Sequence, residues 1–325
     1  QADIFHVFKR ENPELKLDVE FAGYLYHDSP LAKHVLIPVK SQLKRIKYNK
    51  AGDRRFNEKR YQRLFNKPLN LDNPSTYDDK IQWLKLYDRT PLHTQCADKY
   101  AVRDIVAKVI GKEYLIPLLH VTDDHRTLTP ETVPDNCVVK CNHDSMNVVI
   151  VRDAADIDFD DVRQKMRDSL RRNFYYRYRE WQYKDIPPKV IVEKLIIDDK
   201  GNLPADYKIF CFDGKPTYIS VDSDRFGNHT RDIFNTDWER QSLEYRYKHS
   251  DTPPPPPANL ALMLELAEKL AKPFAFSRID FYDTGSQVYF GEITFHPGSG
   301  FNPFKPTEWQ GILGRQIPLR TSTTY

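Results

Sequence analysis

The chain has 325 residues, which is enough for two or three packed lobes. Hydrophobic residues make up 40% and charged residues 29%, a balance typical of a soluble protein, and a formal net charge of +3 gives no argument for nucleic-acid binding. No apolar run approaches the roughly 20 residues that cross a bilayer and no signal-peptide pattern opens the chain, so we expect a cytoplasmic location. The first residue is Gln1 rather than Met, which leaves open that the chain is part of a longer protein.

The N-terminal part of the chain has the patterns of amphipathic helices. Residues 31–49 are basic and amphipathic, and residues 54–66 repeat apolar side chains at helical spacing. The apolar stripe of the second segment consists of Phe56, Tyr61, Leu64 and Phe65. The Lys and Arg residues of these two segments form either solvated helix faces or a patch for an anionic glycan or a membrane surface.

A capping box marks the start of the next helix. Either Ser75 with Asp78 or Thr76 with Asp79 has the required spacing of a small hydroxyl residue and an acid three positions later. The apolar residues that follow form a broad face, so we expect this helix to be buried on one side.

A further helix is expected over residues 96–111. Its apolar residues recur at helical spacing, and Gly111 is a suitable C-terminal stop. Residues 1–112 are therefore expected to form a mostly helical N-terminal region.

Beyond this region the apolar pattern changes to a period of two, which is typical of strands. Strands are predicted within residues 114–121, 136–142, 147–153, 189–198, 206–224 and 278–295. A helix is predicted over residues 158–174, and a proline-rich loop leads into another helix that ends near residue 271. Asp213-Gly214 and Thr284-Gly285 mark hairpin turns. Blocks of helices and strands arranged in hairpins favour the α+β class over a doubly wound parallel sheet.

The cysteines give no sign of a metal site. Cys96, Cys137, Cys141 and Cys211 contain no C-x-x-C pair, so a zinc knuckle is not expected. We expect reduced, buried thiols.

Polar and charged residues lie inside the predicted strands, where each needs a partner. They are Lys140, the pair Glu193-Lys194, Asp206 with Lys208, Arg278 with Asp280, and Glu292 with Thr294. Residues i and i+2 of a strand face the same side, and a short hairpin should bring Asp280 and Glu292 together. Two converging carboxylates suit Mg²⁺, and lysines on neighbouring strands suit a polyphosphate. The pattern predicts a nucleoside triphosphate cleft with a metal, although each pair taken alone also fits a structural salt bridge.

The order of these charged strands resembles the ATP-grasp superfamily, and residues 278–298 are similar to the metal-binding segment of D-alanine–D-alanine ligases. A closer similarity is to the TupA-like ATP-grasp family, which is linked to bacterial surface polysaccharide and teichuronopeptide synthesis. It is carried by segments spread from about residue 55 to residue 313, among them "IQWLKLYDR", "DKYAVRDIV", "VVKCNH", "DYKIFCFDGKP" and "FGEITFHPGSGF". The resemblance implies an ATP-grasp fold in which the helical region 1–112 precedes a small lobe (113–188), a large lobe (189–314) and a tail (315–325).

The resemblance also implies a nucleotide site. Lys140 and Lys208 would contact the phosphates, and the loop from Asn142 to Asn147 would close over them. The remaining implied nucleotide residues are His143 and Ser145 in this loop, Glu193 at the adenine amine, the backbone around Lys194 and Ile196 at the adenine edge, and Asp198 or Asp199 at the ribose. The loop reads "NHDSMN" where glycines are expected, so it also fits a non-catalytic module that binds a nucleotide or a glycan.

For catalysis, the resemblance implies that Arg278, with Lys208, stabilises the transferring phosphoryl group. Asp280 and Glu292 would hold Mg²⁺, and Thr294 stands where relatives often have Asn. The implied activity is an ATP-dependent carboxylate–amine ligase that forms an amide through an acyl phosphate.

The implied substrates are a carboxylate-bearing sugar or glycan and an amine or amino acid, in the decoration of a capsule, teichuronopeptide or O-antigen. Arg225 and Arg231 could hold a uronic-acid carboxylate, and His229, His296 and Ser299 are further candidates for substrate contacts. A polysaccharide-modifying kinase or a glycosyltransferase-associated protein is the alternative. Work on a surface glycan also implies an association with the inner face of the membrane or with a glycan-assembly complex.

Overall fold

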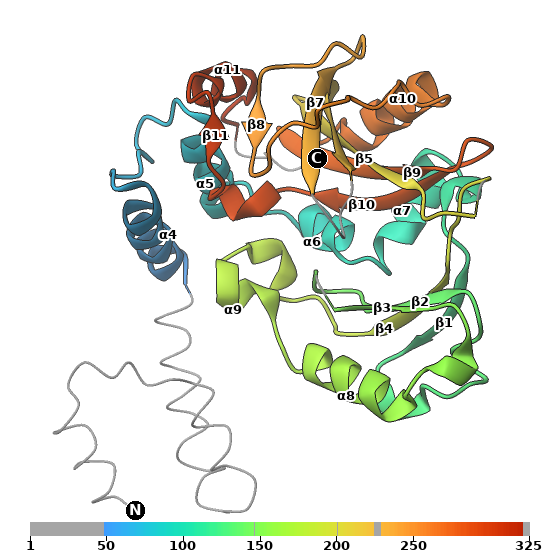
Figure 1. Ribbon diagram of the computed structural model, residues 1–325. Helices are drawn as coiled ribbons and strands as arrows, with labels where there is room; N and C mark the ends of the chain where they lie inside the picture. Colours follow the sequence, from blue (N-terminus) through green and yellow to red (C-terminus); the bar gives the residue numbers. More distant parts are fainter. Residues whose placement is uncertain (1–48, 146, 200, 224–228, 321–325) are drawn as a thin grey trace, which may run out of the picture. The chain divides into compact units, whose positions relative to one another are not determined.

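The computed structural model describes residues 49–320, apart from residues 146, 200 and 224–228 (Figure 1). The chain divides into two units, residues 1–53 and residues 54–325. Apart from Asn49, the basic segment predicted at 31–49 lies outside the described residues, and so does Arg225. Among the described helices, none combines the length and the apolar content that a membrane span requires.

Between Asn49 and the first described strand the structure has four α-helices. They are α4 (Lys50–Phe65), α5 (Tyr77–Tyr87), α6 (Pro91–Ala97) and α7 (Val102–Val109). The capping box of α5 is formed by Thr76 and Asp79 rather than by the alternative pair one residue earlier. The backbone N–H of Asp79 donates to Thr76 Oγ1 at 3.2 Å, and the N–H of Thr76 donates to Asp79 Oδ2 at 3.4 Å.

The single helix predicted over residues 96–111 is wrong, because the chain leaves the helix at Ala97 and re-enters it at Val102. Asp98 causes the break. Its Oδ1 accepts the backbone N–H groups of Tyr100 at 2.8 Å and Ala101 at 3.2 Å. An Asp side chain that satisfies nearby N–H groups competes with the helical hydrogen bonds, so a turn replaces one turn of helix.

A four-stranded antiparallel sheet, here called the small sheet, has the strand order β1-β4-β2-β3. Its strands are β1 (Leu118–Thr122), β2 (Cys137–Cys141), β3 (Val148–Val151) and β4 (Val190–Lys194), and helix α8 (Phe159–Leu170) covers one face (Figure 1). The core between the sheet and α8 includes Val139, Cys141, Val162, Met166 and Val192. Alternation along β2 buries Val139 and Cys141 against α8 and turns Lys140 to the opposite face.

A five-stranded antiparallel sheet, here called the large sheet, has the strand order β10-β9-β5-β6-β7 (Figure 1). Its strands are β5 (Ala205–Phe212), β6 (Lys215–Ser223), β7 (Thr230–Asn235), β9 (Phe276–Asp283) and β10 (Val288–Thr294). The predicted turns join β5 to β6 and β9 to β10. β7 was not among the predicted strands.

The two faces of the large sheet have different covers. Helix α10 (Leu260–Ala271) packs on one face, where Ile209, Ile279 and Phe281 form the core with its apolar residues. On the other face, α5 and α11 (Trp309–Gln316) cover the aromatic part of the sheet. That cover includes Tyr77, Phe210, Phe276, Trp309 and Leu313.

The remaining elements are short. They are α9 (Phe174–Tyr178), the strand pair β8 (Glu244–Tyr245) and β11 (Phe304–Lys305), and the 3₁₀ turns η2 (Lys112–Tyr114), η3 (His125–Thr127), η4 (Ala154–Asp156), η5 (Trp181–Tyr183) and η6 (Pro297–Gly300). Helices and antiparallel sheets confirm the α+β class. The four cysteines are free and buried, as predicted. The lobe and tail boundaries stay a prediction.

Candidate functional site

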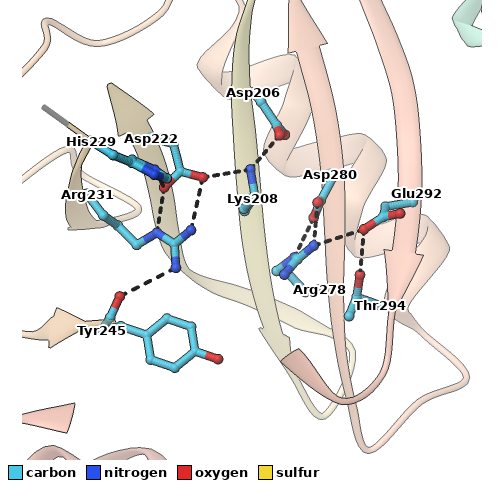
Figure 2. A network of polar contacts seen from close by, with 10 residues as sticks. All are labelled: Asp206, Lys208, Asp222, His229, Arg231, Tyr245, Arg278, Asp280, Glu292 and Thr294. Carbon is cyan, nitrogen blue, oxygen red and sulfur yellow. Dashed lines mark hydrogen bonds and ion pairs between the residues drawn. The ribbon is translucent and has the colours of Figure 1, made fainter. Parts of the chain in front are cut away.

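Charged side chains form a row across the large sheet, on the face opposite α10 (Figure 2). The row arises from the strand register, in which Lys208 and Glu292 are both paired with Asp280. On the other side of β5, Asp222 is paired with Arg231 across β6 and β7. Pairing across antiparallel strands places these side chains beside one another on one face, as the period of two predicts.

Arg278 holds the two carboxylates that were predicted to bind metal. Its Nε lies 2.7 Å from Asp280 Oδ1, and its Nη2 lies 2.6 Å from Asp280 Oδ2 and 3.1 Å from Glu292 Oε1. Thr294 Oγ1 donates to Glu292 Oε1 at 3.0 Å (Figure 2). The structure therefore brings Arg278, Asp280, Glu292 and Thr294 together, as the hairpin pattern predicts.

The two carboxyl groups differ in pKa. Burial raises the pKa of Asp280 to about 7, against the attraction of Arg278. Burial also acts to raise the pKa of Glu292, but the positive charges of Lys99 and Arg278 outweigh it and lower that pKa to about 2. For Arg278, burial acts to lower the pKa, and Asp280 and Glu292 more than offset it, so the pKa lies above its ordinary value. Glu292 is thus an anion at any physiological pH.

The donor set of this pair fits Mg²⁺. Asp280 and Glu292 each contact the same nitrogen of Arg278, at 2.6 and 3.1 Å, so these two oxygens lie within about 6 Å of each other. No group of three or more His, Cys, Asp or Glu residues is arranged for a metal in the part of the chain that the structure describes. Mg²⁺ commonly takes one or two carboxylates and completes its shell with phosphate and water oxygens. Two carboxylates and a hydroxyl are therefore a sufficient protein contribution.

Lys208 lies between two further carboxylates. Its Nζ is 2.5 Å from Asp206 Oδ2 and 3.1 Å from Asp222 Oδ2, and its side chain is 10% exposed. Asp206 was predicted to share a face with Lys208, whereas residue spacing offers no reason to pair Asp222 with it. The Lys208 ammonium group is thus held between two carboxylates.

Asp222 binds two residues that were predicted to contact the substrate, Arg231 and His229 (Figure 2). Arg231 binds it through Nε at 2.6 Å and Nη2 at 3.0 Å, and His229 Nε2 lies 3.1 Å from Asp222 Oδ1. The His229 ring stacks on Tyr247 with ring centroids 3.8 Å apart. The two guanidinium nitrogens that would grip a substrate carboxylate are thus engaged within the protein.

On the small sheet, Glu193 binds two cations. Lys140 Nζ lies 2.6 Å from Glu193 Oε2, and Arg103 Nη1 lies 3.2 Å from Glu193 Oε1. Lys140 and Glu193 share a face because Val138, two residues before Lys140, is paired with Glu193. The structure therefore brings two predicted nucleotide residues together and adds Arg103 to them.

The loop after β2 is tied to the protein by its first two residues. Asn142 Nδ2 donates to Asp98 Oδ1 at 2.8 Å, and its Oδ1 accepts the backbone N–H of Lys189 at 2.7 Å. His143 is 1% exposed, and its Nε2 lies 3.2 and 3.1 Å from the carbonyl oxygens of Ser169 and Arg172. The His143 ring thus faces the end of α8, and its predicted contact with the nucleotide stays a prediction.

The middle of this loop turns its acidic side chain away from Lys99. Asp144 Oδ2 accepts hydrogen bonds from Asn147 Nδ2, at 2.8 Å, and from Ser169 Oγ. The carbonyl oxygen of Asp144 instead accepts a bond of 2.7 Å from Lys99 Nζ, which also lies 3.6 Å from Glu292 Oε2. Ser145, the other predicted loop residue, is exposed. Lys99 thereby connects the loop with the carboxylate pair of the large sheet.

The segment after β4 uses part of its backbone internally. The N–H of Lys194 donates to the Pro117 carbonyl at 3.0 Å, and the N–H of Leu195 donates to the Asn136 carbonyl at 2.7 Å. Ile196 is half-buried. Of the predicted ribose ligands, Asp198 accepts the N–H of Asn202 at 2.7 Å and Asp199 accepts from Ser286 Oγ at 3.0 Å.

His296 and Ser299, predicted as substrate residues, lie in a buried polar cluster after β10. His296 Nδ1 lies 3.1 Å from Gln182 Nε2, and burial lowers the pKa of His296 to about 4, so its ring is neutral at physiological pH. Ser299 has φ = 58°, between two glycines that also have positive φ. Lys85 Nζ donates to Ser299 Oγ at 2.9 Å and to its carbonyl oxygen at 3.1 Å. Both candidates are therefore held by protein groups.

Comparison with known proteins gives one family for most of the chain. The family profile described as TupA-like ATPgrasp matches residues 79–318, which include both sheets. The chain belongs to the TupA-like ATP-grasp family. A search of curated proteins gives no significant match.

Solved structures similar to this TupA-like ATP-grasp protein include several ligases. An L-amino acid ligase from Bacillus licheniformis is 14% identical, with a TM-score of 0.43, and the match covers 75% of this chain and 56% of that chain. A D-alanine–D-alanine ligase from Bacillus anthracis is 18% identical, with a TM-score of 0.37 and coverage of 62% and 57%. The ATP-grasp ligase PsnB, complexed with a phosphomimetic variant of its minimal precursor, Mg and ADP, is 10% identical, with a TM-score of 0.40 and coverage of 74% and 64%. The chain thus spans 56–64% of the length of these three proteins.

Sequence reasoning missed two cations of this TupA-like protein, Lys99 and Arg103. Both lie in the segment "DKYAVRDIV", which carries part of the family resemblance but contains no strand pattern. A local signal was available, because an Asp side chain that accepts nearby backbone N–H groups favours a turn. Asp98 accepts those of Tyr100 and Ala101, and such a turn can project Lys99 away from the helix axis.

Proposed function

We propose that this chain is an ATP-dependent carboxylate–amine ligase that forms an amide through an acyl phosphate. The observation that carries the proposal is the group made by Arg278, Asp280 and Glu292, beside Lys208 and in contact with Lys99. The carboxylates of Asp280 and Glu292 suit a divalent cation. The positive side chains of Arg278, Lys208 and Lys99 suit the oxygens of a triphosphate. Membership of the ATP-grasp family supports the same reading.

In this proposal the small sheet holds the nucleotide. Lys140 contacts the phosphates, Glu193 accepts the adenine amine, and the backbone near Lys194 and Ile196 reads the adenine edge. Because the N–H groups of Lys194 and Leu195 already donate within the protein, the N–H of Ile196 is our candidate for the donor to the base. Asp198 or Asp199 then serves the ribose.

The glycine-poor loop is compatible with phosphate binding. Asp144 sends its carboxylate to Ser169 and Asn147 and presents its carbonyl to Lys99, so its negative charge is hydrogen-bonded within the protein. Ser145, with its hydroxyl and its own backbone N–H, remains our candidate for contact with the phosphates. The scarcity of glycine in this loop is therefore no argument against nucleotide binding.

The proposed reaction has two steps. A carboxylate oxygen of the first substrate attacks the γ-phosphorus of ATP, the bond to the bridging oxygen breaks, and ADP leaves. The nitrogen of the amine then attacks the acyl phosphate carbon, inorganic phosphate leaves, and the amine loses a proton. Mg²⁺ held by Asp280, Glu292 and Thr294 would neutralise phosphate charge, and Arg278 and Lys208 stabilise the negative charge on the phosphoryl oxygens.

The acceptor is proposed to be an anionic glycan, as in the decoration of a capsule, teichuronopeptide or O-antigen. Arg60 and Arg177 lie 5.2 and 5.1 Å from the ring of Tyr178, and Arg60 also lies 5.0 Å from the ring of Phe301, just beyond the loop after β10. Neither arginine, nor Arg63 one turn further along α4, has an ion pair within the described residues. Unpaired arginines on aromatic rings suit a sugar that carries carboxylates, and the same surface would support association with a glycan-assembly complex at the membrane.

The proposal is tested by ADP release from ATP and Mg²⁺ in a matrix of uronic-acid glycans, amino acids and amines. Mass spectrometry of the positive wells should show a product lighter by one water than the two substrates combined, together with one phosphate for each amide. A stable phosphorylated glycan would instead identify a kinase. ATP binding without turnover over the whole matrix would indicate a non-catalytic binding module.

A further inference from the structure

Glu193 receives its two cations from different parts of the fold. Lys140 is on the neighbouring strand β2, whereas Arg103 comes from α7. The Glu193 side chain is 7% exposed, and those of Lys140 and Arg103 are 18% and 17% exposed. Each carboxylate oxygen therefore has its own cation in a largely solvent-excluded position, where charge interactions are strong.

The helix that carries Arg103 is anchored away from Glu193. Val102 and Val106 of α7 are buried in the core that also contains Ile209 and Ile279 of the large sheet. Arg103 thus lies on a helix that packs against the large sheet, and its side chain contacts a carboxylate of the small sheet.

A second attachment fixes the distance between Arg103 and the small sheet. The N–H of Lys99 donates to the Asn142 carbonyl at 3.0 Å, and Asn142 Nδ2 donates to Asp98 Oδ1 at 2.8 Å. These bonds join the turn before α7 to the end of β2. The position of Arg103 is therefore set by two elements rather than by its own rotamer alone.

We propose that Arg103 is a positioning residue for nucleotide binding and acts through Glu193. The inference rests on the proposed function, in which Lys140 meets the phosphates and Glu193 meets the base. Without Arg103, both oxygens of Glu193 would be available to Lys140, and the two would form a closed neutral pair. With Arg103, one oxygen is satisfied separately and the three groups keep a net charge of +1, which suits an anionic phosphate.

The same contact sets the choice of base. A carboxylate fixed at Oε1 by Arg103 presents its remaining lone pairs in one direction, where they accept an N–H from a 6-aminopurine and repel a 6-keto oxygen. A carboxylate that is free to rotate toward Lys140 discriminates less. Arg103 is thus a determinant of selectivity for the 6-amino group, although it touches no ligand in this scheme.

The experiment measures equilibrium binding, with Mg²⁺, of ATP, GTP and purine riboside triphosphate, which lacks the 6-amino group. The variants are Arg103→Gln, Arg103→Lys, Glu193→Gln and the double variant Arg103→Gln/Glu193→Gln. Lys108→Gln is the matched control, because Lys108 is exposed on the same helix and its substitution removes the same charge. Thermal unfolding of each variant checks that the fold is intact.

Arg103→Gln should weaken ATP binding by about tenfold and reduce the preference for ATP over purine riboside triphosphate. Arg103→Lys should recover part of both, and Lys108→Gln should change neither. In the Glu193→Gln background, Arg103→Gln should have little further effect, because the group through which it acts is gone. Equal losses in both backgrounds, or wild-type affinity and preference in Arg103→Gln, would overturn the inference alone. A wild-type protein that binds none of the three nucleotides would overturn the proposed function as well.

Discussion

Asp78 makes the stability of this protein depend on pH. It is 2% exposed, and burial raises its pKa to about 8. Gln310 Nε2 donates to its Oδ2 at 2.6 Å, whereas its Oδ1 is buried and has no hydrogen-bond partner among the described residues. The pair joins α5 to α11. Because its pKa is raised, the carboxyl group is neutral in the folded protein at pH 7, and it is ionised in the unfolded chain.

The sign of the effect follows from the raised pKa. Between the unfolded pKa near 4 and the folded pKa near 8, the folded protein binds one proton more than the unfolded chain, so stability falls as pH rises. Each pH unit in this range costs about 1.4 kcal/mol, which gives an upper limit of about 4 kcal/mol between pH 5 and pH 8. Local relaxation around α5 and α11 should reduce the measured loss to about 2 kcal/mol.

Substitution of Asp78 by Asn removes this titration. Urea unfolding at pH 5, 6, 7 and 8 should show that Asp78→Asn loses less stability than the wild type, with a difference that grows toward pH 8. Asp123→Asn is the control, since Asp123 is exposed and its substitution should leave the pH profile unchanged. Parallel pH profiles for the wild type and Asp78→Asn would refute the reasoning.

Three further predictions concern the proposed site and the loop after β10. Glu292→Gln should abolish Mg²⁺-dependent ATP turnover while circular dichroism shows an intact fold; undiminished turnover would remove Glu292 from the metal site. Lys140→Ala should weaken ATP binding by about ten- to a hundredfold in a calorimetric titration, and an unchanged affinity would reject its role. Gly300→Ala should destabilise the protein by about 2–3 kcal/mol in urea unfolding, because its φ is +67° and the new Cβ would lie 2.7 Å from Gln82 Nε2 and 2.8 Å from Ile81 Cγ2. Wild-type stability of Gly300→Ala would show that this loop relaxes freely.

The sequence predicts the carboxylate pair well because the pair depends on local rules. Period-two alternation and a Gly-containing turn are enough to place Asp280 and Glu292 on facing strands. Register completes the arrangement, since Lys208 and Glu292 are both paired with Asp280. Lys140 and Glu193 share a face of the small sheet only because β2 pairs with β4, and these strands are distant in the sequence.

Contacts between distant segments could not be predicted in this way. Asp222 binds Lys208 and Arg231 because β6 lies between their strands, and neither spacing nor composition reports that order. Lys99 and Arg103 reach the site from a turn and a helix that precede every strand of it. Helical periodicity describes which face such residues occupy but not which sheet they meet.

The polar bonds from α5 to the loop after β10 have a consequence for any attempt to trim the protein. Gln82 Nε2 donates to the carbonyl oxygens of Ser299 and Gly300 at 2.9 Å, and Lys85 holds the Ser299 hydroxyl. A shortened chain that began at β1 would retain both sheets but lose these supports, and with them Lys99 and Arg103. A shortened chain that keeps the loop after β10 in place and retains Lys99 and Arg103 must therefore begin upstream of α5.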